Sequence, residues 1–590
     1  MNKSKARIVG MLLVICLTIS GCGTQQDSSQ TLQGETTQSR AVPKAAPAAV
    51  GDVSIHDLAR LYENDDPASV VTFYLTVRVG NAADGTNHTF EDVNSVLRLQ
   101  GMNDVAVVAA EALLQEGDEQ GPLPGGLGYG QVGANATIRI RGRTSTSYPQ
   151  KSYRIDLFDS AGLWRGQRAI ALNKHPADST RLRNKLYFDL LKGVDHITTL
   201  RTQFVHLYVK DESAEPKQTE FVDFGLFTQV EIPNKRYLRN HELSVSGNLY
   251  KANMCEFFRY PEKLRLATDP LYNAKDFASV LESKTDEDHT KLLEMLDAVN
   301  NYSIPIEQTF EKYFDADNFF TFYAYNLLMS NPDSNAQNYL IYSPVNSSKW
   351  YFIPWDGDSS LRRLEHKLLN YQWEEGSWSW GASNYWSVQI YARVMRVERY
   401  RKMLSERVEE LHRYLTPERM REQMAIYEPT LQRFLTVMPD RANLMTTLEM
   451  REKICSAMPN ELELAYQSYR RSLAKPMPFY LAPVTMKDGA LFFNWSEAYD
   501  FNGELVRYRI QVCKDWAFLP QDVIYESNGQ FGLSATVPMP PAATYYWRVI
   551  ATNERGLQQI PFDEILTRTG VHNGILSFTI TDEGEVKNTQ

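Results

Sequence analysis

Two short stretches of the chain place polar side chains at spacings that could do chemistry. In NPDSNAQNYLIY, Asp333 is followed five positions later by Asn338, and in WYFIPWDGDSS an apolar run stops at Asp356, a glycine and Asp358. Carboxylate and amide oxygens are hard ligands that suit Mg²⁺ or Mn²⁺. Taken singly, each motif is also typical of an ordinary turn, and a purely structural Ca²⁺ site is the alternative for the pair.

A hairpin between the two stretches would bring these residues together. YLIY and WYFIPW are predicted strands, joined by the turn SPVNSS. An antiparallel hairpin returns the end of its second strand to the start of its first, so we expect Asp356 beside Asp333 and Asn338. Protein kinases use an Asp and an Asn at this spacing as proton acceptor and metal ligand, and an Asp after the hairpin holds the magnesium. The pattern therefore predicts phosphoryl transfer.

A lysine upstream is the candidate phosphate ligand. Lys151, in KSYRIDLF, shares strand parity with the apolar residues of its predicted strand. A lysine on an inward face either extends its head to water or meets an anion, and phosphate is the anion that the metal site predicts. Alternatively, Lys151 pairs with a carboxylate such as Glu231. A kinase uses both arrangements, because such a pair holds the lysine for the phosphates. The glycine spacing in GYGQVG is discounted, because its surroundings are rich in glycine.

The residues that must position these groups fall into two parts. From about 51 to 265 the pattern is mainly strand, with alternating β-formers in segments such as VTFYLTVRV, ATIRIRG, TQFVHLYVK and FGLFTQVEI. One helix is predicted over 179–194, with Ser179 or Thr180 as its N-cap and Gly193 at its C-terminal end.

The following part, from about 266 to 474, is mainly helical. Apolar residues recur at helical spacing in segments such as AKDFASVLESK, TKLLEMLDAVNNY and ADNFFTFYAYNLLMS. Thr416 and Pro417 begin a further helix as N-cap and first residue. A strand-rich lobe followed by a helix-rich lobe is the shape that holds a nucleotide between lobes, although a fold alone does not fix function.

A third region, 476–581, is predicted to be all β. Trp495 and the alternating strands around Tyr508 and Trp547 resemble a fibronectin type III domain, in NWSEAYDFNGELVRYRIQV and TYYWRVIATNERG. The resemblance implies a spacer or binding module, with a protein or glycan as its ligand.

The N-terminus predicts export and anchoring. MNKSKAR is basic, and the apolar stretch after it is too short for a comfortable membrane span. The residues Ile19, Ser20, Gly21 and Cys22 resemble a bacterial lipobox, which implies a signal peptide over 1–22 and a lipid on Cys22. The alternative is an ordinary signal peptide with a chance cysteine. Residues 23–50 contain few large apolar side chains and are predicted to be a flexible tether.

Bulk properties exclude some classes. The 590 residues predict two or three domains. A formal net charge of −10 gives no support to nucleic-acid binding, which needs a clustered basic surface. After processing, Cys255, Cys455 and Cys513 remain, and this odd, widely spaced set is neither a disulfide framework nor a metal cluster.

From about residue 70 to about 450 the chain resembles the spore-coat protein H (CotH) family of atypical, secreted protein kinases. The motifs that carry the resemblance are IRIRGRTSTSYPQKSYRIDLF, RLRNKLYFDLL, FGLFTQVEIPNKRYLRNH, NLYK, DSNAQNYLIY and WYFIPWDGD. It implies transfer of the γ-phosphoryl group of ATP to Ser or Thr of a protein substrate rich in those residues, with Mg²⁺ or Mn²⁺ as cofactor. It implies Asp333 as catalytic base, Asn338, Asp356 and Asp358 as the metal site, and Lys151, Arg141 and Glu231 as the nucleotide site.

Three positions depart from the expected pattern. Arg143 stands where the family's hairpin has Asn, Gln150 replaces the first lysine of a pair, and Asn331-Pro332 precede Asp333 where ordinary kinases have His-Arg. These departures keep open a catalytically silent, kinase-like adhesion or binding protein. A different metal-dependent phosphotransfer or hydrolysis is the third hypothesis.

The predicted fold class is thus α+β. A two-lobed atypical protein-kinase-like domain over 51–474 precedes an all-β sandwich resembling fibronectin type III. The predicted location is extracytoplasmic, on a bacterial membrane, to which the protein is held by its N-terminal lipid.

Overall fold

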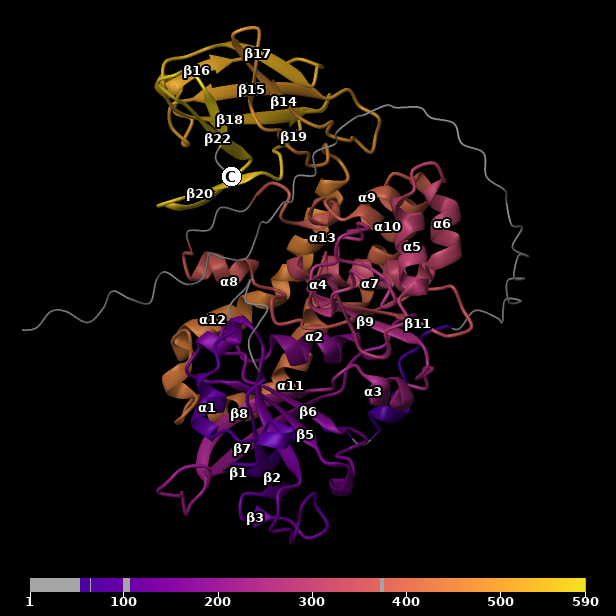
Figure 1. The fold of residues 1–590 in the computed structure, drawn as a ribbon, viewed down its shortest axis with the longest axis vertical. Coiled ribbons are helices and arrows are strands. Elements are labelled where there is room, and N and C mark those ends of the chain that lie inside the picture. Colours follow the sequence, from indigo (N-terminus) through magenta and orange to yellow (C-terminus); the bar gives the residue numbers. More distant parts are fainter. Residues whose placement is uncertain (1–53, 64, 99–106, 372–375, 589–590) are drawn as a thin grey trace, which may run out of the picture.

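The structure is a computed structural model that describes residues 54–63, 65–98, 107–371 and 376–588. It consists of a sheet-rich part, a helical part and a C-terminal β-rich part, stacked in that order along the longest axis (Figure 1). The predicted signal peptide, Cys22 and the tether lie outside the described residues. Within those residues, no helix is both long and apolar enough to span a membrane.

The sheet-rich part is a closed barrel. Its described strands follow the order β1-β7-β8-β6-β5-β4-β2-β3, and β1 also pairs with β2, which closes the ring. Alternate residues such as Ile138, Ile155 and Leu207 fill the interior with apolar side chains. The strands are β1 Val70–Arg78, β2 Ala109–Asp118, β3 Gly121–Pro122, β4 Ala136–Arg141, β5 Ser152–Leu157, β6 Ala169–Asn173, β7 Thr202–Asp211 and β8 Val222–Val230.

The predicted strands of this part are confirmed, but β2, like β3 and β6, was not predicted. Its sequence, AAEALLQEGD, is rich in residues that favour helices. It is a strand because it fills the position between β1 and β4, with Ala110, Ala112 and Leu114 buried in the barrel interior. Packing in the sheet therefore overrides local preference.

The helix predicted over 179–194 begins later than expected. In the structure α2 spans Arg183–Leu191, and its N-cap, Leu182, makes no side-chain capping bond. The predicted N-caps are wrong because Thr180 donates instead to the carboxylate of Asp178, whereas Gly193 does follow the C-cap residue Lys192, with a left-handed φ of 77°. The Asp178 carboxylate also accepts from the backbone N–H of Arg183 and so satisfies the start of the helix.

The helical part surrounds a second sheet of order β10-β9-β11-β12. Its strands are β9 Asn248–Ala252, β10 Leu281–Ser283, β11 Tyr339–Ser343 and β12 Tyr351–Pro354. Because β9 pairs with β11, residues before 265 already belong to this sheet. The helix predicted from AKDFASVLESK ends at Val280, and its last residues form β10.

The helices of the described chain agree with the remaining periodic segments, and Thr416 caps α11 by accepting from Arg419 N–H. Their bounds are α1 Phe90–Ser95, α3 Lys235–Asn240, α4 Ala274–Val280, α5 Thr290–Asn300, α6 Ile306–Tyr313, α7 Ala316–Leu328, α8 Arg363–Leu368, α9 Gln389–Met395, α10 Glu398–Tyr414, α11 Pro417–Leu435, α12 Leu448–Ala457 and α13 Glu461–Ser472.

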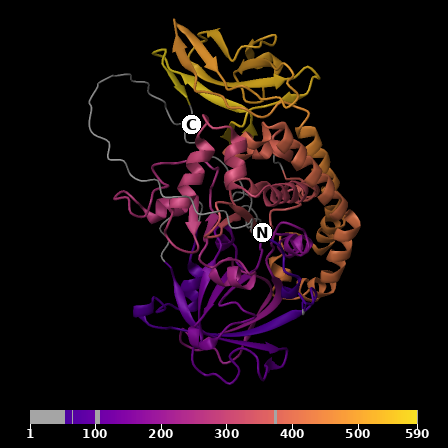
Figure 2. The ribbon, with the colours of Figure 1, turned by 90° about the vertical axis from the view of Figure 1, so that its right-hand side faces the viewer.

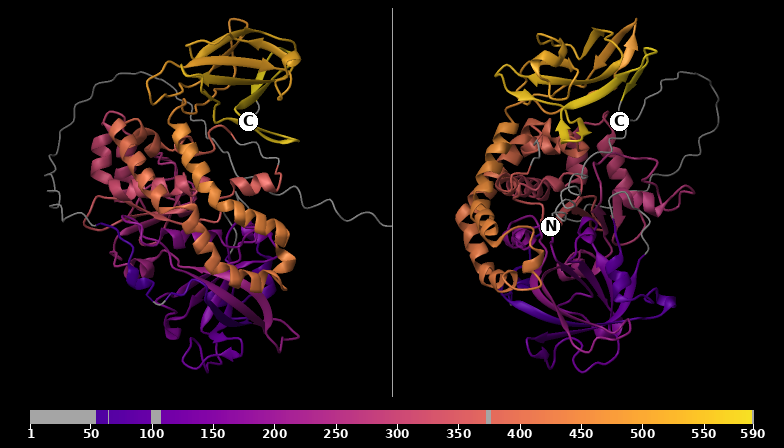
Figure 3. Two further views of the ribbon diagram at one scale, coloured as in Figure 1. Left: turned by 180° about the vertical axis from the view of Figure 1, so that it is seen from behind. Right: turned by 90° about the vertical axis from the view of Figure 1, so that its left-hand side faces the viewer.

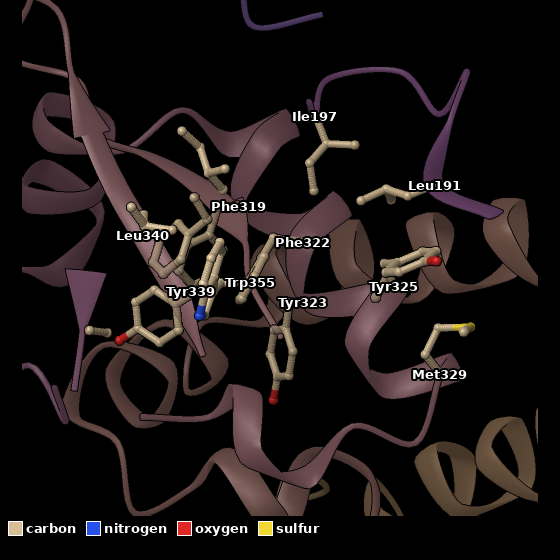
Figure 4. Close-up of a cluster of buried hydrophobic side chains, with 14 of the residues drawn as sticks. Leu191, Ile197, Phe319, Phe322, Tyr323, Tyr325, Met329, Tyr339, Leu340 and Trp355 are labelled. Atoms are coloured by element: carbon tan, nitrogen blue, oxygen red, sulfur yellow. The ribbon is translucent and has the colours of Figure 1, made fainter. Parts of the chain in front are cut away.

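Aromatic side chains join α7 to the second sheet. Figure 4 shows Phe322 and Tyr323 of α7 beside Tyr339 of β11 and Trp355 just after β12. The rings of Phe322 and Tyr339 lie 5.6 Å apart, and those of Phe322 and Phe352 lie 5.0 Å apart. Such close packing fixes the β11–β12 hairpin as a rigid support for the loops at its ends.

Helix α11 connects the two parts. It runs down the side of the molecule from the helical part onto the barrel (Figure 2). Tyr427 packs its ring against Phe204 of β7 at 5.8 Å, and Phe434 packs against His206 at 4.7 Å. The barrel and the helices are therefore held in one arrangement through this helix.

The C-terminal part is a β-sandwich, named here the C-terminal sandwich (β13–β23). It lies at the end of the molecule remote from the barrel (Figure 3). Leu491 and Phe493 from one sheet share a core with Ile510 and Trp547 from the other. Its strands are β13 Thr485–Lys487, β14 Ala490–Asn494, β15 Arg507–Cys513, β16 Val523–Glu526, β17 Ser534–Pro538, β18 Ala543–Thr552, β19 Gln558–Gln559, β20 Glu564–Thr567, β21 Gly570–Asn573, β22 Ile575–Ile580 and β23 Val586–Asn588.

Candidate active site

The β11–β12 hairpin places the two acidic motifs side by side, as predicted. Tyr339 pairs with Pro354, and the N–H of Trp355 donates to the carbonyl of Asn338 at 3.1 Å. Asp356 therefore follows directly on the residue bonded to Asn338. The buried strand β12 acts as a rigid element that fixes where the carboxylates emerge.

The backbone at this point is unusual. Asn338 and Asp356 have φ angles of 58° and 52°, the left-handed region that side chains other than glycine rarely adopt. Gly357 is required for a different reason: a Cβ there would lie 2.2 Å from the ring of Tyr187. The glycine between the two carboxylates thus allows the loop to pack directly on α2.

Asp333 is linked to the second loop by a hydrogen bond. It lies in a 3₁₀ turn over Pro332–Ser334, and the hydroxyl of Ser359 donates to its Oδ2 at 2.9 Å. Burial, followed by the charge of Asp358, raises its pKa and outweighs the lowering by Ser359 and Arg362. A carboxylate with a raised pKa beside a hydroxyl donor is well suited to accept a proton.

The carboxylates of Asp356 and Asp358 have opposite pKa shifts. Burial, together with repulsion from Asp358, raises the pKa of Asp356 to about 6. Burial alone would also raise the pKa of Asp358, but a hydrogen bond from His175 and the electrostatic contribution of that ring lower it below its usual value. Two adjacent carboxylates under such repulsion form a site that favours a cation.

A short relay of side chains holds this loop to α2. The N–H of Gly357 donates to Asn184 Oδ1 at 2.9 Å, and Asn184 Nδ2 lies 3.2 Å from His175 Nε2. Because the amide donates to Nε2, the ring proton resides on Nδ1, which lies 3.3 Å from Asp358 Oδ2. The Asp358 carboxylate is thereby held in its orientation by α2, through Asn184 and His175.

The far end of the loop is tied down as well. Arg183 is fully buried, forms an ion pair with Glu365, and donates to the carbonyl of Leu361 at 3.2 Å. The N–H of Leu361 donates to the carbonyl of Met329, the C-cap residue of α7, at 3.1 Å. Both acidic loops are therefore anchored to the same scaffold.

Two cations face the acidic loop across Trp355. The charged groups of Arg141 and Lys251 lie 5.8 Å and 5.9 Å from the centre of its ring. Burial lowers the pKa of Arg141 to about 10 and that of Lys251 to about 8, although Asp356 opposes the shift in both. Glu282, the partner of Lys251 in the strand pairing, also opposes the lowering of the Lys251 pKa. Among the described residues, Arg141 Nη1 is buried without a hydrogen-bond partner, as expected of a group that awaits an anion.

The structure does not bring Lys151 to this group. Its Nζ donates to the carbonyl of Thr146 at 2.5 Å, within the loop that leads into β5, and burial lowers its pKa. Within the described chain, the side chains that lower the pKa of Asp356 are His175, Arg141 and Lys251. No contact therefore supports the phosphate role predicted for Lys151, and Lys251 has the better position for it.

Glu231 does not pair with Lys151 either. Its carboxylate binds Arg201 at 2.6 Å and His241 at 3.0 Å. Burial would raise its pKa, but these two partners lower it to about 2. The pairing considered for Glu231 is not formed, because Arg201, just before β7, and His241, the C-cap residue of α3, already occupy its carboxylate.

Sequence reasoning missed four residues of the site: His175, Asn184, Lys251 and Ser359. Lys251 had a usable signal, since it is a lysine within the buried strand NLYK, where an unpaired cation is costly. The others carry no local signal, because their roles depend on how α2 and the loop after β12 meet.

The side chains present fit the divalent cation that a kinase requires. Asp356 and Asp358 supply carboxylates and Asn338 supplies an amide, and Mg²⁺ usually takes one or two protein carboxylates together with substrate phosphates. Among the described residues, no three His, Cys, Asp or Glu side chains form a metal-binding group. The phosphates of a nucleotide would complete the set of ligands around such a cation.

The barrel, the second sheet and the two acidic loops define a mixed α/β protein with a site suited to a metal-bound anion. Residues 138–470 match the family model described as CotH kinase protein, which covers more than half of the chain and every candidate site residue except the predicted lipidation site. The chain belongs to the CotH kinase protein family. A search of curated proteins found no match.

Proposed function

We propose that the protein is an extracytoplasmic kinase that transfers the γ-phosphoryl group of ATP to Ser or Thr of a protein substrate. The observation that carries the proposal is the arrangement around the hairpin. Asp333 is bonded to the loop of Asp356 and Asp358, and the cations Arg141 and Lys251 face that loop from the barrel and from β9. A proton acceptor, a metal site and phosphate ligands are the parts that phosphoryl transfer requires.

Each side chain then has a role. Asp333 accepts the proton of the acceptor hydroxyl, and Ser359 holds its carboxylate in place. Asn338, Asp356 and Asp358 would hold Mg²⁺ or Mn²⁺, which supplies charge neutralisation at the phosphates when bound. Lys251 and Arg141 bind the phosphate oxygens. Arg143, which stands where the family's hairpin has Asn, adds positive charge beside Lys251 and Glu282. This charge also favours binding of the phosphate.

The decisive experiment measures nucleotide binding and transfer by the purified wild-type protein. ATP with Mg²⁺ should raise the melting temperature, since a ligand at a hundredfold excess over Kd stabilises by about 2.7 kcal/mol. Label should pass from γ-labelled ATP to the protein itself or to peptides rich in Ser and Thr. Binding without any labelled acceptor would favour a silent, kinase-like binding protein. Absence of both ATP binding and transfer would refute the kinase proposal.

We expect Lys251→Met to raise the Kd for ATP by roughly 10- to 100-fold, because a hydrogen bond to a charged group contributes about 1.5–3 kcal/mol. The measurement is titration with ATP in the presence of Mg²⁺. Lys151→Met is the matched control and should bind within about twofold of wild type, since its amine bonds a loop carbonyl. The opposite ranking would return the phosphate role to Lys151.

Membrane anchoring through Cys22 belongs to the same proposal. The lipobox-like residues before Cys22 are its support. In bacterial cells Cys22→Ala should leave the precursor unprocessed or release the protein from the membrane fraction, because acyl chains supply the anchor. Wild-type protein that is soluble, with a mature N-terminus elsewhere, would contradict this expectation.

We further propose that the C-terminal sandwich is of the fibronectin type III kind and binds a protein or glycan. The buried Trp495 and the hydroxyl of Tyr545 support this proposal. That hydroxyl donates to the carbonyl of Pro541, four residues upstream, at 2.9 Å, as in the tyrosine corner of such sandwiches.

A further inference from the structure

A segment over 377–386 touches the turn that carries Asp333. The side-chain amide of Asn384 donates to the carbonyl of Pro332 at 3.1 Å, and Asn335 donates back to the carbonyl of Asn384 at 3.1 Å. The hydroxyls of Tyr385 and Ser334 lie 2.7 Å apart. These contacts hold the residues on both sides of Asp333.

The contact between Tyr385 and Ser334 is sealed from water. Ser334 is 0% exposed and Tyr385 is 2% exposed. Because the single hydroxyl proton of Ser334 is donated to the carbonyl of Asn331, the phenol of Tyr385 must be the donor to Ser334. A buried hydrogen bond of this kind is expensive to lose, since the acceptor cannot turn to water instead.

The other end of the segment binds the C-terminal sandwich. Ser377 Oγ accepts from Gln559 Nε2 at 2.8 Å and from the backbone N–H of Ile560 at 3.3 Å. Trp378 Nε1 donates to the carbonyl of Pro561 at 3.1 Å, and its ring packs against Phe562 at 5.3 Å. The sandwich therefore binds the segment through both backbone and side-chain groups of its residues 559–562.

Between its two ends the segment is rigidly held. Gly381, with a φ of 74°, packs against α13, where an added Cβ would lie 2.7 Å from the carbonyl of Ser468. The N–H of Ala382 donates to Ser472 Oγ at 3.0 Å. The ring of Tyr385 lies 4.5 Å from that of Tyr323 on α7. The segment thus links the sandwich to the Asp333 turn through a continuous series of contacts.

We infer that Asn384 and Tyr385 are positioning residues for Asp333 and that the C-terminal sandwich holds them in place. The inference rests on the proposed phosphoryl transfer, and it gives the sandwich a role in the reaction besides any ligand that it binds. Asp333 has its own side chain bonded only to Ser359 among the described residues. Its backbone position therefore depends on the residues that flank it.

The direct test compares two tyrosines. Tyr385→Phe removes only the hydroxyl that reaches Ser334, and kcat for transfer should fall by about 10- to 100-fold, because a misplacement of around 1 Å can cost about 10²-fold. The Kd and the KM for ATP should stay unchanged, since neither Tyr385 nor Ser334 faces the nucleotide site. Tyr391→Phe is the matched control, because in the described residues its buried hydroxyl has no hydrogen-bond partner. Equal kcat values for the two variants would overturn the inference.

The coupling to the sandwich is tested from its own side. Trp378→Ala and the milder Ser377→Ala, both in the full chain, should lower kcat in the same way and speed amide hydrogen exchange over 331–338 by at least about fivefold. Phe531→Ala, on an exposed part of the same sandwich, should change neither quantity. If Trp378→Ala lowers the melting temperature of the whole chain, its effects could reflect general destabilisation. The kcat and the hydrogen-exchange rate of Ser377→Ala then decide whether the sandwich holds the turn.

Hydrogen exchange separates this inference from the proposed function. If wild type transfers no phosphate, the kinase proposal fails, whereas faster exchange confined to 331–338 still supports the positioning role. If exchange over 331–338 stays at the wild-type rate in both variants, the sandwich does not hold the turn. Faster exchange spread evenly over the chain would mean general destabilisation and would also overturn the inference.

Discussion

Asp333→Asn protein is expected to bind ATP and Mg²⁺ nearly as wild type does and to transfer phosphate slower by about 10²–10⁴-fold, the usual contribution of a positioned proton acceptor. In the proposed role, Asp333 would contact the acceptor hydroxyl and not the nucleotide, so ATP binding should survive the substitution. Asn has nearly the same volume as Asp, and its side-chain oxygen can still accept from Ser359. The assay is label transfer from γ-labelled ATP, alongside an ATP titration.

The control for this substitution is Asp195→Asn, which changes an exposed carboxylate and should leave transfer at the wild-type rate. Because Asp333 is half-buried and its pKa is raised, its neutralisation should not lower the melting temperature by much. Equal transfer by wild-type and Asp333→Asn proteins would show that another group takes the proton.

The acidic motifs could be predicted because their geometry is local. The β11–β12 hairpin is read from two apolar runs and a turn, and its pairing alone brings Asp356 next to Asn338. Few rearrangements of the remaining chain could separate them. The same reasoning explains why the strands β4 and β5, a second hairpin, were predicted with nearly correct ends.

The partners of the acidic loop could not be predicted because they arrive from distant parts of the chain. His175 and Asn184 precede and begin α2, and reach Asp358 and Gly357 only when α2 packs beneath the loop. Lys251 reaches Trp355 because β9 pairs with β11, a pairing that no local pattern fixes. Strand parity predicted Lys151 on the inward side of its strand, but β5 begins only at Ser152 and the amine of Lys151 bonds the loop carbonyl of Thr146.

Asp356→Asn is expected to lose both ATP binding and transfer. Unlike Asp333, this side chain would contact the metal, which carries phosphate charge in the bound state and in the transition state alike. In wild type the repulsion between Asp356 and Asp358 is relieved when a cation binds, and this relief contributes to the affinity. The variant removes one carboxylate and with it that contribution. The melting temperature should therefore no longer rise with ATP and Mg²⁺.

Asp358→Asn provides the graded comparison for that result. The Asp358 carboxylate is 37% exposed and already bonded to His175. A bound cation would therefore stabilise it less than it would stabilise the Asp356 carboxylate. We therefore expect Asp358→Asn to keep a reduced, measurable rise in melting temperature that higher Mg²⁺ restores, whereas Asp356→Asn stays unresponsive over the same range. A wild-type rise in Asp356→Asn would show that its carboxylate is not a ligand. An unresponsive Asp358→Asn beside a responsive Asp356→Asn would move the metal to the second carboxylate of the loop.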